Sequence, residues 1–448
     1  MINVIGAGLA GCEAAWQIAN RGINVKLYEM KPKTMSPAHS SKNFAELVCS
    51  NSLRADGLHN AVGLLKEEMR LFDSLIMEAA DFCKVPAGGA LAVDREGFSA
   101  HITEKIKSHS NITVINEEVT EIPSDYPTII AAGPLASDGL ADSIAKLTSQ
   151  QHLHFFDAAA PIVTKESVDM SNAFFGARYD KGGDDYINCP MSKDEYLEFY
   201  QNLITARLAP LNENVDNPNV FEGCMPVEVM AKRGEDTLRF GPLKPVGLTS
   251  PDGSKPYAVV QLRQDNAAGT LYNLVGFQTR LAFGEQERVF SLIPALKNAE
   301  FVRLGVMHRN TYINSPKLLD NTFKYVQTPA DCVGTPFQKG AENPLYFAGQ
   351  ITGVEGYVES AASGLLAGIN SANEVLGESP LTLPRTTALG ALAAYVSNQA
   401  ITDFQPMNIN FGIMEPLTQR IRDKREKSLE ISKRSLNFLD KYVRMKSE

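Results

Sequence analysis

The sequence of 448 residues predicts an α/β protein in which a parallel-sheet domain is interrupted by a second, mixed α/β unit. Three observations predict this class. Residues 1–29 show a strand, a glycine-rich turn, a helix and a second strand, and two later apolar strands, near residues 128–134 and 345–356, also end in glycine. Hairpin and helix patterns fill the stretch between them, from 161 to 320. Because the chain is too long for one ordinary core, two packed units are expected.

Composition and charge restrict the class of protein further. Hydrophobic residues make up 44% of the chain and charged residues 21%, which are ordinary globular values. The net charge of −9 argues against bulk attraction to nucleic acid or an anionic membrane, although it leaves room for a local basic face. Met1–Ile5 runs directly into Gly6 without a secretory signal, and the apolar stretch 388–396 is too short to span a bilayer. We therefore expect a cytoplasmic protein without membrane insertion.

The first 29 residues carry a nucleotide-binding pattern. It consists of an apolar strand Ile2–Ile5, a turn Gly6-Ala7-Gly8-Leu9-Ala10-Gly11, a helix Cys12–Asn20 and a strand Asn24–Tyr28 closed by Glu29. In such a turn the first glycine permits the sharp bend, the second lets the backbone approach a pyrophosphate, and the third lets helix and strand pack closely. The pyrophosphate lies at the helix N-terminus, and the acid accepts hydrogen bonds from the adenosine ribose. All six turn residues and Glu29 are therefore predicted to bind a dinucleotide.

Two later segments favour FAD over NAD, which the first motif alone does not distinguish. A strand Leu345–Ala348 is followed by Gly349, Gly353, Gly356 and a helix of small residues, and Thr128–Pro134 is a strand ending at Gly133. A second glycine-rich turn before a helix suits the flavin end of an extended FAD, although a core helix packed through Ala and Gly is the alternative. We predict a discontinuous Rossmann-like FAD-binding domain at 1–160 and 321–448, with a mixed α/β insertion domain at 161–320.

The insertion shows both helical and hairpin patterns. Two apolar runs, Tyr257–Leu262 and Leu271–Phe277, flank a polar connection and predict a hairpin. Tyr196, Phe199 and Leu203 recur at helical spacing.

The six cysteines are widely scattered, and no two of them form a C-x-x-C pair. This spacing excludes the usual structural zinc patterns and the close dithiol of flavin disulfide reductases, so we expect free thiols and no metal site. The cysteines are Cys12, Cys49, Cys83, Cys189, Cys224 and Cys332.

Two of these cysteines lie in settings that suit chemistry. Cys224 lies between a glycine and a Met-Pro pair in an irregular connection, and Lys232 and Arg233 follow it. Cys49 lies where an apolar run gives way to polar residues that include Arg54. A nearby positive charge favours the thiolate, which is the reactive form. For each cysteine, the alternative is a small buried hydrophobe.

Seven longer motifs carry a resemblance to a known family. They are "GAGLAGCEAAWQIANRGI", "NFAELVCSNSLR", "VPAGGALAVDR", "FEGCMPVEVMAKRG", "VVQLRQDNAAG", "GVMHRN" and "AGQITGVEGYVESAASG". Together they closely resemble the folate- and FAD-dependent tRNA (uracil-5-)-methyltransferases, the TrmFO (Gid) family. The match covers essentially the whole chain.

The resemblance implies a reaction and its cofactors. The carbon donor would be 5,10-methylenetetrahydrofolate, FAD the carrier and reductant, NADPH or NADH the electron source, and the T-loop uridine of tRNA the acceptor. On the matching positions, Cys224 resembles the thiol that adds to the uracil ring, and Cys49 the second active-site thiol near the flavin. Whether Cys49 acts as a base, as a shield for the flavin or only as a neighbour stays open. Glu228 and Tyr357 are alternative proton carriers, and His308 and Arg309 are candidates to contact the folate.

The C-terminal tail offers a candidate RNA-contacting surface. Residues 417–448 contain ten Lys or Arg against five acids, and apolar residues recur at helical spacing, so one face can dock while the other meets phosphate. A solvated charged helix is the alternative.

Three other functions stay open from the sequence. They are a general FAD-dependent NAD(P)H oxidoreductase with structural cysteines, a related flavoprotein that modifies another RNA uridine, in ribosomal RNA or at the wobble position, and a flavin-containing RNA-binding module without turnover.

Overall fold

The computed structural model describes the chain except for residues 37, 150–152, 181–182, 211–224, 327–342 and 448. For residues 153–157, 180, 308, 309, 446 and 447 it describes the backbone only.

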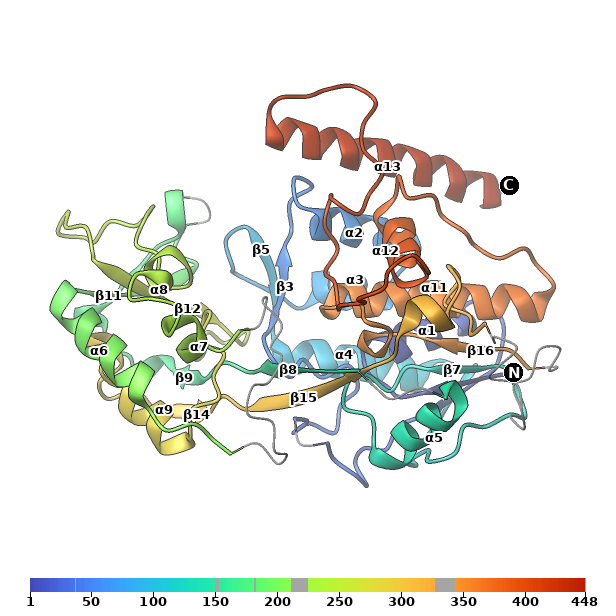
Figure 1. The fold of residues 1–448 in the computed structure, drawn as a ribbon, viewed down its shortest axis with the longest axis horizontal. Coiled ribbons are helices and arrows are strands. Elements are labelled where there is room, and N and C mark those ends of the chain that lie inside the picture. Colours follow the sequence, from blue (N-terminus) through green and yellow to red (C-terminus); the bar gives the residue numbers. More distant parts are fainter. Residues whose placement is uncertain (37, 150–152, 181–182, 211–224, 327–342, 448) are drawn as a thin grey trace.

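The two outer parts of the sequence form a five-stranded parallel sheet (Figure 1). The strand order is β16-β7-β1-β2-β6, and every neighbouring pair is parallel. The strands are β1 (Ile2–Ile5), β2 (Val25–Tyr28), β6 (Ile112–Ile115), β7 (Thr128–Ile130) and β16 (Leu345–Phe347). The three predicted strands that end in glycine, β1, β7 and β16, are therefore side by side, and their glycine turns meet at one edge of the sheet.

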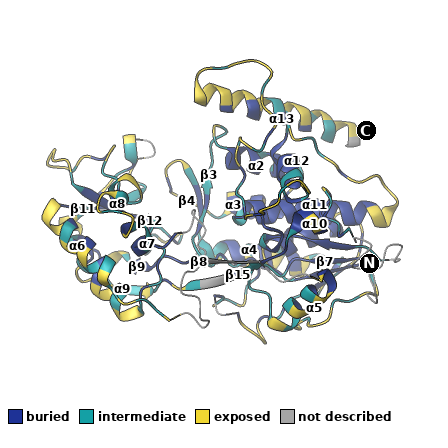
Figure 2. Cartoon of the chain, viewed as in Figure 1, coloured by how far each residue is buried: buried dark blue, intermediate teal, exposed yellow. Residues whose placement is uncertain are grey.

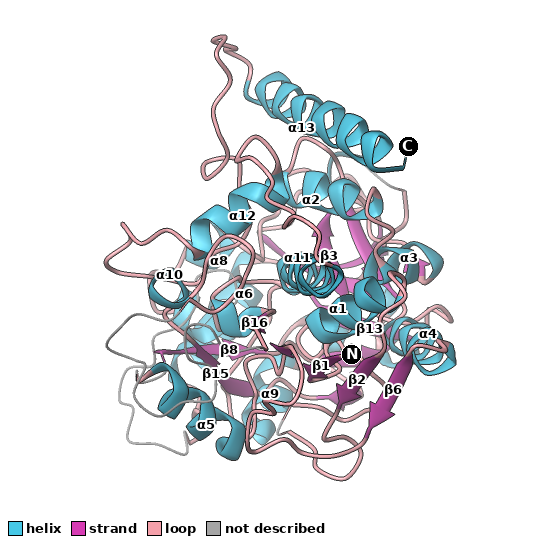
Figure 3. Ribbon diagram, turned by 90° about the vertical axis from the view of Figure 1, so that its right-hand side faces the viewer, coloured by secondary structure: helices cyan, strands magenta, loops and turns pink. Residues whose placement is uncertain are grey.

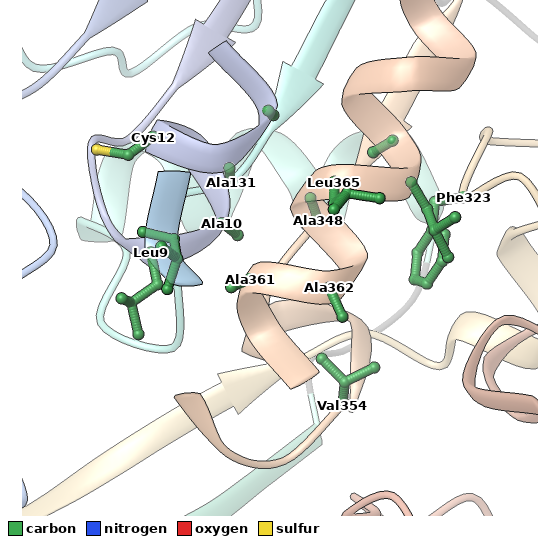
Figure 4. Packing of buried hydrophobic residues seen from close by; sticks show 14 of the residues in the cluster. Leu9, Ala10, Cys12, Ala131, Phe323, Ala348, Val354, Ala361, Ala362 and Leu365 are labelled. Carbon is green, nitrogen blue, oxygen red and sulfur yellow. The ribbon is translucent and has the colours of Figure 1, made fainter. Parts of the chain in front are cut away.

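Two helices rich in small residues cover this sheet. They are α1 (Leu9–Ala19) and α11 (Tyr357–Leu376). A Cβ atom added to Gly364 of α11 would lie 2.2 Å from the carbonyl oxygen of Ala10, and one added to Gly368 would lie 2.8 Å from Cα of Ala14. Figure 4 shows the small side chains of Ala10 and Ala361 where the two helices approach each other. Only residues this small let the two N-termini converge on one edge of the sheet.

Further helices are stacked above α11, farther from the sheet (Figure 3). The helices α2 (Ala61–Arg70) and α12 (Ala388–Val396) form the next layer, and α13 (Lys424–Ser447) is the outermost. The remaining elements of this part are α3 (Leu75–Phe82), α4 (Arg95–Ser108), α5 (Asp138–Thr148), α10 (Ser315–Leu318) and an antiparallel sheet of β3 (Ser52–Ala55), β5 (Ala90–Val93) and β4 (Lys84–Val85).

The insertion forms a second, antiparallel sheet of six strands in the order β10-β11-β12-β13-β9-β14. The predicted hairpin is present, because β12 pairs antiparallel with β13. The predicted helical spacing corresponds to α6. The elements are β9 (Ile162–Thr164), β10 (Phe174–Phe175), β11 (Tyr186–Met191), α6 (Lys193–Thr205), α7 (Val227–Ala231), α8 (Thr237–Phe240), β12 (Ala258–Gln264), β13 (Leu271–Leu274), α9 (Phe283–Phe290) and β14 (Phe301–Arg303).

An antiparallel pair of strands connects the two sheets. The chain leaves the parallel-sheet part through β8 (Leu153–Ala158) and returns through β15 (Met307–Tyr312), and the two strands pair along their whole length. In Figure 1 they run between the two halves of the molecule.

Each sheet has its own hydrophobic core, which Figure 2 shows as the buried segments of the two halves. The larger core draws on residues 2–147 and 312–431, and the second on residues 160–296. The predicted α/β class, a Rossmann-type parallel sheet with a mixed α/β insertion, is confirmed. We retain the division into 1–160 with 321–448, and 161–320, as a proposal.

Candidate functional site

A large cavity opens at the edge of the parallel sheet where β1, β7 and β16 end. The empty space within it and at its open mouth amounts to about 1090 Å³. Of the residues predicted to bind a dinucleotide, those that line it are Gly6, Ala7, Gly8, Leu9, Ala10, Glu29, Gly133 and Gly349. Gly11, Gly353 and Gly356 are not among the lining residues. They shape the backbone of the two turns that border the cavity.

The turn before α1 is built for close backbone approaches. Gly6 has φ +99°, and a Cβ atom at Gly11 would lie 1.7 Å from the carbonyl oxygen of Gly6. Both positions therefore exclude any side chain. Gly8 differs, because a Cβ atom there would have no heavy atom within 4 Å and would project into open space. Gly8 is also the N-cap of α1 and provides no side-chain cap, so the first N–H groups of the helix are available to an anion.

Glu29 lies directly after β2 and lines the same cavity. The residue is 7% exposed, and its two carboxylate oxygens accept hydrogen bonds from the backbone N–H groups of Ala7 (2.9 Å) and Lys31 (2.9 Å). These bonds fix the carboxylate against the glycine turn. Each oxygen keeps a further lone pair with which to accept a hydrogen bond from a ligand hydroxyl.

The second glycine-rich turn leads into α11. The N-cap of this helix is Gly356, with φ +110° and no side-chain cap. Gly349 has φ +87°, and a Cβ atom added to it would lie 3.0 Å from the Cβ atom of Ala10. A Cβ atom at Gly353 would lie 2.5 Å from the ring of Phe404. This turn therefore places a second helix N-terminus without a side-chain cap beside the cavity. Tyr357, in the first turn of α11, lines the cavity.

A buried ion pair and a histidine also line the cavity. Lys31 Nζ lies 3.7 Å from Glu46 Oε2, and both side chains are only 4% exposed. His39 lies beside them, and burial together with the Lys31 charge lowers its pKa below the usual value. The neutral imidazole is therefore favoured at physiological pH.

Cys49 lies in the segment that joins this cavity to β3. Its thiol donates a hydrogen bond to the carbonyl oxygen of Ala158 (3.3 Å), at the end of β8. The hydroxyl oxygen of Tyr357 accepts hydrogen bonds from the backbone N–H groups of Cys49 (2.8 Å) and Ser50 (3.2 Å). Burial raises the pKa of Tyr357 far above its usual value, so the hydroxyl stays protonated. Cys49 is thus half-buried, close to the first turn of α11 and to the strand pair that leads to the insertion.

Three arginines hold the segment that contains Cys49. Arg95 donates to the carbonyl oxygen of Leu47, and Arg303 Nη2 donates to that of Val48 at 2.9 Å. Arg263, on β12, donates from Nη2 to Ser50 Oγ (2.6 Å) and from Nε to Asn51 Oδ1 (3.1 Å). Arg263 and Arg303 come from the insertion side, so the second sheet positions the Cys49 segment.

The charges of these arginines are only partly balanced. Arg95 makes a two-bond ion pair with Asp265, at 3.2 Å and 2.9 Å. Burial lowers the pKa of Arg263 and of Arg303 below the usual value. A buried guanidinium bound mainly to neutral acceptors leaves positive potential around it. Arg263 and Arg303 therefore add positive charge around the segment that contains Cys49.

Cys224 lies outside the described residues, and so does Cys332. The side chains of His308 and Arg309, the folate candidates, are also outside the described part of the chain. Cys12 and Cys189 are fully buried and act as core residues, and burial raises the pKa of each thiol.

The structure gives other sequence candidates structural roles. Arg54, with φ +63°, forms an ion pair with the buried Glu359, so its charge is neutralised. Glu228 is buried and accepts hydrogen bonds from Thr279 Oγ1 (2.9 Å) and the N–H of Arg280 (2.7 Å), and burial raises its pKa. Among the residues that are described, no group of three or more His, Cys, Asp or Glu is arranged to hold a metal ion.

Sequence reasoning missed the arginines that surround Cys49. They come from α4, β12 and β14, so no local pattern marks them. The motif "VVQLRQDNAAG" contains both Arg263 and Asp265, but its hairpin pattern alone does not indicate a site.

Comparison with known proteins identifies the family. Residues 1–379 match the model of the glucose inhibited division protein A (GIDA) family. The chain belongs to this family.

Individual proteins match this GIDA-family chain over nearly its whole length, beyond the residues that the family model covers. It is 62% identical, over 99% of its length and 98% of the relative's, to "Methylenetetrahydrofolate--tRNA-(uracil-5-)-methyltransferase TrmFO" of Acetivibrio thermocellus. It is 57% identical to proteins of the same name from Bacillus mycoides, over 99% of both chains, and Listeria monocytogenes, over 98% of both.

A solved structure shares the fold of this GIDA-family protein. GidA of Aquifex aeolicus superposes with a TM-score of 0.69 at 16% identity, covering 99% of this chain and 73% of that one. Within the described part of the chain, no helix has both the length and the apolar character needed to cross a bilayer.

Proposed function

We propose that this chain is a folate- and FAD-dependent tRNA (uracil-5-)-methyltransferase. The observation that carries this function is the 62% identity to TrmFO of Acetivibrio thermocellus, sustained over 99% of the chain. The geometry supports it, because the same chain has a cavity lined by both glycine-rich turns beside the Cys49 segment. The acceptor we propose is the T-loop uridine of tRNA, with NADPH or NADH as electron source.

The overall reaction balances with these reactants. Uridine, 5,10-methylenetetrahydrofolate, NAD(P)H and a proton give 5-methyluridine, tetrahydrofolate and NAD(P)⁺. The one-carbon unit arrives at the oxidation level of formaldehyde, so two electrons are needed to make it a methyl group. The nicotinamide supplies them as hydride, and the carbon 5 proton leaves the ring.

Three features of the cavity match the parts of FAD. The N-terminus of α1, capped only by Gly8, would receive the pyrophosphate, and Glu29 would receive the hydroxyls of the adenosine ribose. The N-terminus of α11, with Gly349 and Tyr357, would border the flavin end. When bound, FAD supplies the carriage of the one-carbon unit and of the hydride.

Carbon 5 of uracil is a poor nucleophile until a thiolate adds at carbon 6. We assign this addition to Cys224. The S–C6 bond moves the ring's π electrons toward carbon 5, which forms a bond to the one-carbon unit, and the carbon 5 proton is lost as the unit's remaining bond to its carrier breaks. Hydride delivered to this carbon makes it a methyl group and the S–C6 bond breaks, so the thiolate is regenerated.

Cys49 is proposed as the second thiol of the site. The residue is half-buried, its thiol donates to the carbonyl oxygen of Ala158 at the end of β8, and its backbone N–H donates to Tyr357 in the first turn of α11. Arg303 holds the carbonyl oxygen of Val48, and Arg263 holds the side chains of Ser50 and Asn51, so the residues on both sides of Cys49 are fixed from the insertion. The insertion therefore completes a site that the parallel sheet begins.

The direct experiment supplies carbon-labelled methylenetetrahydrofolate, NADPH and unmodified tRNA to the purified protein. We expect label as a methyl group in the T-loop uridine. Label in ribosomal RNA or at the wobble uridine instead would reassign the acceptor. NADPH oxidation without label in any RNA would overturn the function in favour of a general oxidoreductase.

A further inference from the structure

A run of cations lies where the chain enters α13, and the site described above does not use it. Residues 420–427 contain five cations and two acids, Asp423 and Glu426, which gives a net charge of +3 over eight residues. All five cations are exposed. We call this run the cationic segment, and its basic residues are Arg420, Arg422, Lys424, Arg425 and Lys427.

The other described cations of α13 are largely occupied within the chain. Lys433 pairs with Glu430 (3.8 Å), and Arg444 pairs with Asp440 (3.0 Å). Arg434 donates to the carbonyl oxygens of Glu415 (2.5 Å) and Pro416 (3.0 Å).

The cationic segment differs in this respect. Across the described part of the chain, none of its five basic residues forms an ion pair. Its acid Asp423 is occupied, because Oδ1 accepts a hydrogen bond from the N–H of Glu426 (2.7 Å) and caps the helix. The positive charge of the segment is therefore available to an external anion.

The position of this charge is unfavourable for the helix itself. Lys424, Arg425 and Lys427 lie in the first turn of α13, where the partial positive charge of the helix dipole disfavours cations. Each such contact costs about 0.3–1 kcal/mol at low ionic strength. An anionic partner at this end of the helix offsets that cost.

The rest of α13 is fixed to the body of the molecule. Ser432 Oγ donates to the carbonyl oxygen of Leu58 (2.7 Å), and Ser435 Oγ donates to Glu68 Oε1 on α2 (2.5 Å). Ile431 and Leu439 are buried at 3% and 0% exposure. The position of the first turn of α13 is therefore fixed relative to the body of the molecule.

The direction of α13 suits a large substrate. In Figure 1 its first turn lies at the end of the helix nearer to the insertion sheet, and Figure 2 shows its outward side exposed along its length. The strand pair β8 and β15, beside which Cys49 lies, runs between the two halves of the molecule in the same view. An elongated anion bound at the site between the halves can therefore extend toward the cationic segment.

We propose that the cationic segment binds the phosphate backbone of the tRNA while a uridine occupies the site. This inference rests on the proposed function, because it takes tRNA as the substrate. An RNA backbone supplies closely spaced phosphates that match several Lys and Arg side chains. A membrane surface fits less well, because a membrane-bound amphipathic helix needs a continuous free apolar face. In α13 Ile431 and Leu439 are buried against the protein, and the exposed large hydrophobics are Leu429, Phe438 and Met445.

The test replaces three cations of the segment together, as Lys424→Gln, Arg425→Gln and Lys427→Gln. The matched control replaces three cations farther along the same helix, as Lys433→Gln, Lys441→Gln and Arg444→Gln. For each protein, the KM for tRNA and the Kd for tRNA without folate are measured from low to physiological salt. Flavin content and kcat at saturating tRNA are recorded beside them.

We expect the segment variant to raise the KM and Kd for tRNA about tenfold, with kcat and flavin content unchanged. The slope of log Kd against log salt should fall by about 2, since each lost phosphate contact contributes about 0.7–0.9. Equal KM, Kd and salt slopes in the two variants would overturn the proposal. The proposal would also be overturned if the segment variant kept the original affinity for tRNA but, in a parallel measurement, lost binding to anionic phospholipid vesicles.

Failure of the proposed function gives a different result. In that case the unmodified protein transfers no label to tRNA, whatever the state of α13. The Kd measured without folate still reports on the segment.

Discussion

The hydroxyl of Tyr357 accepts hydrogen bonds from the backbone N–H groups of Cys49 and of the residue after it, at 2.8 Å and 3.2 Å. Tyr357 belongs to the first turn of α11 and lines the cavity, whereas Cys49 is 308 residues earlier in the sequence. One side chain therefore links the wall of the proposed flavin site to the backbone of the proposed second thiol.

Removing this hydroxyl tests the link. Tyr357→Phe leaves two partly buried N–H groups without their acceptor, which costs about 1–3 kcal/mol of stability for each such group that stays unpaired. We also expect a lower rate of methyl transfer at saturating tRNA, because the Cys49 segment loses its attachment to α11. Unfolding by urea and single-turnover rates measure the two effects.

Tyr395→Phe is the control for this prediction. The Tyr395 hydroxyl donates a hydrogen bond to the carbonyl oxygen of Gln405 (2.6 Å), away from the cavity lining. Its loss should reduce stability without changing the transfer rate. If Tyr357→Phe lowers stability and leaves the rate unchanged, the hydroxyl is structural only.

The glycines of the first turn separate flavin binding from folding. Gly8→Ala adds a methyl group with no heavy atom within 4 Å, so the protein without flavin should be as stable as the original, within about 0.5 kcal/mol. If a pyrophosphate lies at this N-terminus, the same methyl group should weaken FAD binding by tenfold or more, at about 1.4 kcal/mol per tenfold. Flavin titration of the deflavinated protein measures the affinity.

Gly11→Ala is the companion variant. Its Cβ atom would lie 1.7 Å from the carbonyl oxygen of Gly6, so we expect loss of folded protein rather than of flavin alone. A Gly8→Ala protein that binds FAD normally would place the pyrophosphate elsewhere.

A buried carboxylate makes the docking of α13 depend on pH. Glu68 is fully buried, and its oxygens accept hydrogen bonds from the N–H groups of Ala388 (2.7 Å) and Leu389 (2.8 Å) and from Ser435 Oγ (2.5 Å). Burial raises its pKa from 4.5 to about 7. Between these two values the native chain binds more protons than the unfolded chain, so stability falls as the pH rises.

The size of this effect is about 3 kcal/mol between pH 4.5 and 7, from 1.36 kcal/mol per pKa unit. Because Gln is neutral at every pH and so resembles the protonated acid, Glu68→Gln should flatten the dependence over this window. Urea unfolding at several pH values measures it, with Glu67→Gln as control, whose side chain is 41% exposed and pairs with Arg70. A variant with an unchanged pH dependence would show that another group is responsible.

Much of the fold follows from local sequence pattern. The strand, turn and helix of residues 2–19 were predictable because glycine spacing and apolar periodicity are local properties. The same is true of the β12–β13 hairpin and of α6. Helix boundaries were less predictable: α1 begins at Leu9, three residues before the expected start at Cys12, because Gly8 rather than a polar side chain occupies its N-cap.

The electrostatic surroundings of Cys49 could not be predicted in this way. Arg54 was the candidate nearest in sequence, but tertiary structure pairs it with Glu359. Arg263 and Arg303 reach the segment from the second sheet, more than 200 residues away along the chain. Such contacts depend on how two units pack, for which a single sequence carries no periodic signal.

The central claim is that the thiol of Cys224 activates the uracil ring. The most direct measurement compares methyl transfer to tRNA by Cys224→Ala and by Cys83→Ala, where Cys83 is the half-buried C-cap residue of α3 and serves as control. We predict that Cys224→Ala abolishes transfer, that Cys49→Ala slows or abolishes it, and that Cys83→Ala retains it, with FAD bound in all three. Transfer at the original rate by Cys224→Ala would contradict the account.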